Sequence, residues 1–203
     1  TLMNGLAQSK NSITAFLMKK VKPKNVVRLG KKLGFSNLKP IPSLCLGSVE
    51  IPLFQMTSSY TMFANKGVKV EPVFLKKIED KNGIIIFNHK PNYKDILNEE
   101  INYVMLKLLQ GVVDKGTAGR LRQSKTKNKN YRNDDYKTLN NIGYEFTNEI
   151  AGKTGTTDNH SDGWFIGLAP DLVTGVWVGG EERSIHFRNI TLGSGSNMAL
   201  PIW

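Results

Sequence analysis

The sequence predicts a fold of the α+β class, in which helices are combined with strands joined by hairpins. Apolar residues recur at helical spacing in 13–20, 24–33, 53–65 and 99–113, which predicts a helix in each range. By contrast, β-branched residues dominate 149–157, and a hairpin-like run follows over 163–169 and 174–180. Shorter strands are expected at 68–70, 73–75 and 84–87, the last pair joined across an Asn-Gly turn at 82–83.

Length and composition indicate a globular chain. Its 203 residues are enough to bury one sizeable core, and 39% hydrophobic with 22% charged residues is not the composition of a disordered segment. No apolar run approaches the ~18 to 20 residues of a membrane-spanning helix, and the start has no signal-peptide pattern. We therefore expect no membrane or export element within this stretch. Cys45 is the only cysteine, which excludes an internal disulfide, and its apolar neighbours predict a core thiol.

The positive charge is concentrated in two stretches. The net charge is +11, and the range 10–39 holds nine Lys or Arg and no Asp or Glu. The range 115–137 holds eight basic residues against Asp134 and Asp135. Because aromatic interleaving is sparse and no helix-turn-helix, zinc-finger or RNA-binding motif is present, we do not expect nucleic acid as a partner. A solvated basic face is the favoured interpretation, and an anionic membrane surface or polymer is the functional alternative.

The most informative stretch runs from 149 to 157 and contains Lys-Thr-Gly-Thr-Thr. Strand alternation predicts Lys153, Gly155 and Thr157 on one face and Thr154 and Thr156 on the other. Since Gly155 has no side chain, another backbone can approach closely and pair with the strand. The lysine and the hydroxyls beside it suit an extended ligand that carries a carboxylate.

A second box, Ser9-Lys10-Asn11, precedes this strand and is expected on a loop between two helical pieces. Taken alone, Ser and Asn between helices are ordinary cap and turn residues, and an isolated Lys-Thr-Gly is a weak signal. The two boxes in this order, however, are part of a signature shared by penicillin-binding proteins and class A β-lactamases.

On these boxes the chain resembles the C-terminal part of the transpeptidase domain of class A, bifunctional penicillin-binding proteins. Further segments that resemble this family are 42–50, 60–67, 109–117, 161–167 and 176–179. The resemblance implies a helical subdomain packed against an antiparallel sheet with helices on both faces. It also implies that 1–203 is a partial transpeptidase domain, in which the polar range 121–141 is expected to be a mobile basic loop of undetermined role.

One element of the family pattern is missing. The family's nucleophile is the serine of a Ser-x-x-Lys box that precedes the Ser-x-Asn box, and nothing in 1–8 supplies it. Later matches at 36–39 and 124–127 follow Ser9 in the chain and are interpreted as chance. We therefore expect this chain to hold no nucleophile and to be inactive by itself.

The resemblance implies a D,D-transpeptidase that cross-links peptidoglycan stem peptides through an acyl-serine intermediate. In that mechanism Ser9 relays a proton to the departing D-alanine, Lys153 polarises Ser9, and Asn11 binds the stem-peptide backbone. The substrate would lie along a strand whose binding residues are Thr154, Gly155, Thr156 and Thr157. The hydroxyls of Thr154 and Thr156 are the candidates for its terminal carboxylate, and the Thr156 N–H for half of the oxyanion hole.

The resemblance further implies β-lactams as acylating inhibitors, a glycosyltransferase domain upstream in the same chain, and a location at the bacterial inner membrane with the domain facing outward. No cofactor is expected. No metal is expected either, since the three histidines lack metal-ligand spacing. Three alternatives remain open: a D,D-carboxypeptidase or β-lactamase-like hydrolase, a non-catalytic penicillin-binding sensor or scaffold, and a basic nucleic-acid-binding module.

Overall fold

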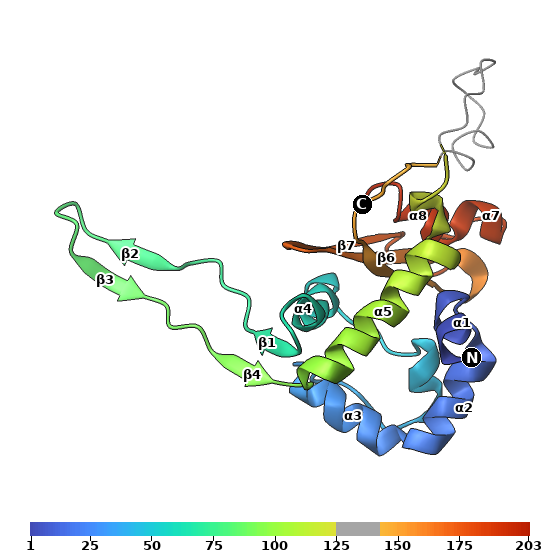
Figure 1. Cartoon of the computed structure of the whole chain (residues 1–203), viewed down its shortest axis with the longest axis horizontal. Helices are drawn as coiled ribbons and strands as arrows, with labels where there is room; N and C mark the ends of the chain where they lie inside the picture. Colours follow the sequence, from blue (N-terminus) through green and yellow to red (C-terminus); the bar gives the residue numbers. More distant parts are fainter. Residues whose placement is uncertain (125–142) are drawn as a thin grey trace, which may run out of the picture.

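The computed structural model describes residues 1–124 and 143–203, and Figure 1 shows how their helices and strands are arranged. The helices are α1 (Leu2–Ala7), α2 (Asn11–Val21), α3 (Pro23–Lys32), α4 (Leu53–Ala64), α5 (Glu99–Lys115), α7 (Ile190–Gly193) and α8 (Gly195–Met198). The strands are β1 (Val68–Val70), β2 (Lys77–Glu79), β3 (Ile85–Asn88), β4 (Tyr93–Asp95), β5 (Ala151–Thr156), β6 (Asp162–Ala169) and β7 (Leu172–Gly179). Short 3-10 helices are η1 (Pro42–Leu46), η2 (Gly119–Leu121) and η3 (Asp158–His160). The predicted loop at 121–141 lies mostly outside the described residues.

The sheet that contains the Lys-Thr-Gly strand has the order β5-β6-β7, and its strands are antiparallel. Within the described part of the chain β5 is therefore an edge strand. Because successive side chains of a strand point to opposite faces, Ala151, Lys153 and Gly155 share one face, and Thr154 and Thr156 share the other. The predicted alternation holds for these residues, while Thr157 lies one residue beyond the end of β5.

Helices cover both faces of this sheet, as the family resemblance implies. Helix α4 lies on the Lys153 face, where a Cβ on Gly175 of β7 would be only 2.0 Å from Thr57 Oγ1. Helix α8 lies on the opposite face, where a Cβ on Gly163 of β6 would be 2.6 Å from Met198. Glycine at these strand positions therefore lets each helix approach the sheet backbone closely.

The sheet divides the hydrophobic core into two clusters. The cluster on the α8 face comprises Val112, Val113, Ala118, Leu121, Ile150, Phe165, Ala199 and Leu200. Trp203 meets Phe165 edge-on in this cluster, with ring centroids 5.3 Å apart. The cluster on the α4 face comprises Met62, Phe63, Leu109, Ala151 and Leu168. Since α5 contributes to both clusters, it is the central helix that ties the helical part to the sheet.

The N-terminal half of α5 differs from the predicted pattern. Its start is confirmed, because the Asn98 side chain accepts a hydrogen bond from the N–H of Ile101 at 2.9 Å. The apolar spacing of 99–113 predicts that Ile101 and Val104 point inward, and this is wrong, since these side chains are 51% and 55% exposed. The inward position is taken by Asn102, whose amide donates to the carbonyl of Phe63 at 2.9 Å. Apolar spacing cannot reveal which side of the helix faces inward here, because the buried position is occupied by an amide with a backbone partner and not by an apolar residue.

The range 68–95 forms an arm that projects from the body of the molecule (Figure 1). Strands β1 and β4 pair at its base, and β2 and β3 pair near its tip. The predicted Asn-Gly turn is present, with Gly83 at φ +83°. The strand expected at 73–75 is wrong, and Phe74 is 90% exposed. Because the Asn-Gly turn determines which residues face each other, β3 pairs with 77–79 and not with 73–75. At the base of the arm, β1 pairs with β4, a strand that apolar content did not predict.

Candidate active site

Ser9 lies in the tight turn between α1 and α2, as the sequence predicts for its box. Its backbone has a φ of +51°, a left-handed conformation that non-glycine residues rarely adopt. The turn is closed by the Ser9 N–H, which donates to the carbonyl of Leu6, and by the Lys10 N–H, which donates to the carbonyl of Gly5. The hydroxyl-bearing residue is thus held in one orientation between two helices, on the exposed side of the turn.

The structure brings the two boxes together across 144 positions of the chain. The Nζ atom of Lys153 donates to Ser9 Oγ at 2.9 Å and to the carbonyl of Thr154 at 2.8 Å. Lys153 belongs to β5, whose outer edge pairs with no other strand of the described residues. An ammonium group that donates to a hydroxyl makes that hydroxyl a better proton donor to a third group.

Lys153 is a partly buried cation, and burial lowers the pKa of its ammonium group from 10.5 to about 8. At neutral pH most molecules still carry the charge. No carboxylate in residues 1–124 or 143–203 forms an ion pair with Lys153, since the described ion pairs join other residues. A desolvated cation without a counter-ion is costly, so this site favours an anionic ligand.

The position of Ser9 depends on close contact between the ends of α1 and α5. The N–H of Thr117 donates to the carbonyl of Ala7 at 3.0 Å, and Gln8 Nε2 donates to the carbonyl of Lys115 at 2.7 Å. Gly116 makes this approach possible, because a Cβ there would lie 2.2 Å from the Ala7 carbonyl oxygen. The glycine therefore helps to hold the Ser9 turn against β5.

We expect the Gly116→Ala change to separate α1 from α5 and to lower the free energy of unfolding by about 1–3 kcal/mol, as overpacking typically does. Urea denaturation of the full-length gene product measures this loss. Gly119→Ala is the matched control, since its Cβ would have only one neighbour, at 3.9 Å. Equal losses in the two variants would show that the close approach of Gly116 to Ala7 is not the cause.

The predicted binding residues occupy different settings. Thr156 is exposed, and its Oγ1 accepts the N–H of Gly195 at 3.0 Å, which leaves its own proton available to a ligand. Asn11 is the exposed first residue of α2, next to Ser9 and Lys10. Gly155 lies on the Lys153 face of β5, where its missing side chain leaves room beside Trp164. All three are close in the chain to Ser9 or Lys153, and their assignment to substrate stays a prediction.

Two of the predicted hydroxyls are engaged within the protein. The buried Thr154 hydroxyl lies 2.5 Å from the hydroxyl of Thr117. The Thr157 hydroxyl lies 2.9 Å from Ser161 Oγ and accepts the N–H of Asp162 at 2.9 Å, which closes the turn between β5 and β6. Their assignment to substrate therefore stays a prediction.

Sequence reasoning did not single out Thr117 and Gly195, which contact the predicted binding strand through the hydroxyls of Thr154 and Thr156 on one face of β5. Thr117 follows the central helix, and Gly195 begins α8 with a Cα so close to β5 that a Cβ would lie 2.2 Å from the Gly155 carbonyl oxygen. The small residues at 116–119 are the one local feature of the sequence that indicates the contact of Thr117 with β5. No local pattern marks the contact of Gly195.

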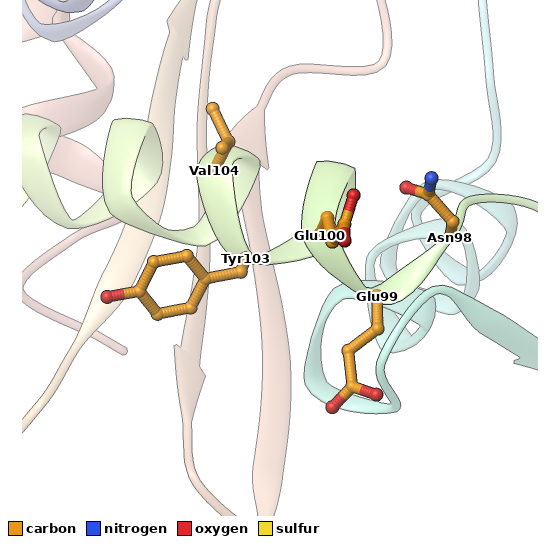
Figure 2. A pocket seen from close by; sticks show the side chains of 5 residues that line it. All are labelled: Asn98, Glu99, Glu100, Tyr103 and Val104. Atoms are coloured by element: carbon orange, nitrogen blue, oxygen red, sulfur yellow. The ribbon is translucent and has the colours of Figure 1, made fainter.

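Two hollows lie elsewhere in the described part of the chain. One of about 760 Å³ is lined by Asn98, Glu99, Glu100, Tyr103 and Val104 at the start of α5, and Figure 2 shows these side chains pointing in different directions. The Ser9 turn contacts the other end of this helix, whose 17 residues span about 25 Å. A second hollow of about 550 Å³ lies between α2 and η1 and includes the half-buried Cys45. Neither contains the two boxes.

Other candidate groups are not assembled into a site. Ser36 lies in the exposed connector after α3, and the match that begins at Ser124 continues outside the described residues.

In the ranges 1–124 and 143–203, no group of three or more His, Cys, Asp or Glu side chains is placed to hold a metal ion. None of the helices described combines the length and apolarity needed to cross a bilayer.

Comparison with known proteins gives consistent matches. Residues 1–180 match the model of the penicillin-binding protein transpeptidase domain. The chain is 39% identical over its whole length to penicillin-binding protein 1A of Aquifex aeolicus and 30% identical over 91% of its length to penicillin-binding protein 2D of Bacillus subtilis, and it spans 24% of each of these proteins.

Solved structures give the same picture of the fold. The crystal structure of penicillin-binding protein 1A from Haemophilus influenzae matches the whole chain with a TM-score of 0.80 at 20% identity, over 33% of its own length. The PonA1 protein of Mycobacterium tuberculosis, solved in complex with penicillin V, matches with a TM-score of 0.71 at 18% identity, over 55% of its length. At these identities the likeness concerns the fold alone.

Proposed function

Because this chain belongs to the penicillin-binding protein transpeptidase domain family, we propose that it supplies the proton-relay and substrate-binding half of a D,D-transpeptidase active site. The observation that carries the proposal is the contact of Lys153 with Ser9, in which a partly desolvated cation that pairs with no carboxylate of the described residues polarises a hydroxyl. Acyl transfer from a peptide that ends in a carboxylate needs both features, a proton relay and a fixed positive charge.

The nucleophile is assigned to the serine of a Ser-x-x-Lys segment that precedes Ser9 in the gene product. Its oxygen attacks the carbonyl of the penultimate D-alanine and forms the acyl-serine ester, while the C–N bond to the last D-alanine breaks. Ser9 gives its proton to the departing amine and is reprotonated by the proton that leaves the nucleophile. An amine of a second stem peptide then attacks the ester, forms the cross-link and returns the serine to its starting state.

Lys153 has two roles in this scheme. Its ammonium group holds the Ser9 hydroxyl in place through the 2.9 Å hydrogen bond, and its charge stabilises the negative charge that develops on the acyl carbonyl oxygen. A β-lactam would acylate the same serine by opening its ring, because the ring amide replaces the scissile peptide bond. The acyl group then stays attached, since no free amine leaves the site.

The substrate peptide is placed along the outer edge of β5. Thr156 is the favoured donor to the terminal carboxylate, because its hydroxyl is exposed and its oxygen is already oriented by Gly195. Its N–H is the candidate for half of the oxyanion hole, and Gly155 allows the peptide backbone to approach. Asn11 is assigned to the stem-peptide backbone. Thr154 holds β5 against Thr117, and Thr157 holds the turn between β5 and β6 through Ser161.

The whole protein is assigned to the outer side of the bacterial cytoplasmic membrane, with a glycosyltransferase domain upstream of the transpeptidase domain. The support for this assignment is that relatives named penicillin-binding protein 1A are about four times longer than this chain, which covers 24% of the Aquifex aeolicus protein. Penicillin V as a ligand of PonA1 supports β-lactams as inhibitors.

Labelling the full-length gene product with a fluorescent penicillin tests the proposal. We expect a stable covalent label on one serine of a Ser-x-x-Lys segment, located by mass spectrometry, and cross-linked dimers of stem peptides when uncross-linked peptidoglycan is supplied. Release of the last D-alanine without cross-linking would identify a carboxypeptidase, and rapid loss of the label a β-lactamase. Absence of any label would leave a non-catalytic scaffold and overturn the proposal.

A further inference from the structure

Helix α3 carries a stripe of cations on its solvent side. Lys24, Arg28 and Lys31 are spaced by four and three residues, which places them in one row along the helix, and all three are exposed. The opposite side contains Val27 and Gly30, which are buried against the rest of the fold. The sequence of α3 therefore directs its apolar side inward and its whole charged side to solvent.

This charge is not neutralised within the described part of the protein. The range 10–39 contains nine Lys or Arg and no acidic residue, and all nine basic side chains are exposed. The described ion pairs involve Lys66, Lys77, Arg122 and Arg183, none of which belongs to this range. A row of exposed cations without acidic neighbours creates a positive potential that attracts extended anions.

Helix α2 connects the stripe to the candidate active site. Lys10 stands between Ser9 and Asn11, and α2 leads directly from the site toward α3, as Figure 1 shows. Helix α2 has 11 residues, so its two ends are about 16 Å apart. The stripe therefore lies beyond the reach of a dipeptide or an antibiotic bound at Ser9, but within the reach of a polymer that passes through the site.

We propose that the basic surface of α3, defined by Lys24, Arg28 and Lys31, binds the anionic peptidoglycan strand that presents the stem peptides to Ser9 and Lys153. This inference rests on the proposed transpeptidase function. Each uncross-linked stem peptide ends in a free carboxylate, so a strand that carries many stem peptides presents a row of separated carboxylates. The stripe holds neighbouring carboxylates of the strand while one stem peptide occupies the candidate active site, which raises the local concentration of substrate.

Other anionic partners fit this surface less well. A helix that lies on a membrane inserts an apolar side into the lipid, but the apolar side of α3 is occupied by its own fold. A single-stranded nucleic acid requires aromatic side chains on which bases stack, and 22–32 contains none. A flexible polymer with separated carboxylates needs only the row of point charges.

The test compares two triple variants of the full-length gene product with the same change in net charge. The first carries Lys24→Glu, Arg28→Glu and Lys31→Glu; the control carries Lys76→Glu, Lys81→Glu and Lys90→Glu, three exposed lysines of the arm. At low salt we expect the first variant to bind soluble uncross-linked strands about tenfold or more weakly, because three surface charge contacts are lost. At 0.5 M salt the difference should shrink, since charges on the surface are then screened. The control should bind as the wild type does.

Two further measurements separate this inference from the proposed function. Fluorescent penicillin should label the wild type and both variants at equal rates, because the antibiotic does not reach the stripe. Strands whose carboxylates have been converted to amides should bind to the wild type no more tightly than they bind to the first variant. If the first variant misfolds and is therefore not labelled by fluorescent penicillin, the neutral triple variant with Gln at the same three positions is used in its place.

Equal strand binding by the two variants, with normal labelling, would overturn the inference and leave the proposed function intact. Stripe-dependent binding of duplex DNA, or of phosphatidylcholine vesicles with 30% phosphatidylglycerol, without binding of strands would also overturn it. Absence of label in the wild type would instead overturn the proposed function.

Discussion

Removal of the Ser9 hydroxyl and of the Lys153 ammonium group is expected to give losses that do not add. In the full-length gene product, Ser9→Ala and Lys153→Met should each slow acylation by fluorescent penicillin by about 10²- to 10⁴-fold, the range typical of a lost proton-transfer group. The double variant should be no slower than the slower single variant. The reason is that Lys153 acts through Ser9 by the hydrogen bond at 2.9 Å, so either change removes the same relay.

Single-turnover labelling rates at pH 7 measure all members of this cycle. Ser12→Ala and Lys90→Met are the matched controls, because both residues are exposed and neither contacts the Ser9–Lys153 pair. Losses that multiply in the double variant would mean that the two side chains act independently, which would contradict the relay. Normal labelling of the Ser9→Ala variant would remove this serine from the mechanism altogether.

The acylation rate is expected to fall as the pH rises through about 8, by close to tenfold per unit once most Lys153 side chains are neutral. Burial lowers the pKa of this ammonium group to about 8, so the positive charge that the mechanism needs is present at pH 7 and lost at pH 9 to 10. Rates of penicillin labelling between pH 6 and 10 give the profile. A rate that increases through pH 8 would instead assign Lys153 the role of a neutral base.

Lys153→Arg is the control for this profile. A guanidinium group keeps its charge across this range, so whatever rate the variant retains should not decline between pH 8 and 10.

The lowered pKa of Lys153 also has a consequence for stability. Since the unfolded chain holds the Lys153 proton more tightly than the folded chain, the contribution of this residue to stability should increase as the pH rises from about 8 to about 10.5.

Many features of this protein follow from interactions between close neighbours in the chain, and these were predictable. The Asn98 cap, the Asn-Gly turn of the arm and the strand at 151–156 each depend on residues within a few positions. The turn that presents Ser9 between two helices is local in the same way. Prediction failed for strand 73–75 and for the side of α5 that faces inward, because partners distant in the sequence decide both.

By itself the sequence determined the order of the two boxes, the alternation of side chains along β5 and the concentration of cations in 10–39, since all three are properties of the covalent chain. Only the tertiary structure decided that Lys153 reaches Ser9, that the Thr154 hydroxyl is held by Thr117, and that burial lowers the lysine pKa. The physical reason is that hydrogen bonding across 144 positions and desolvation depend on how α1, α5 and β5 pack together. Local patterns contain no information about that packing.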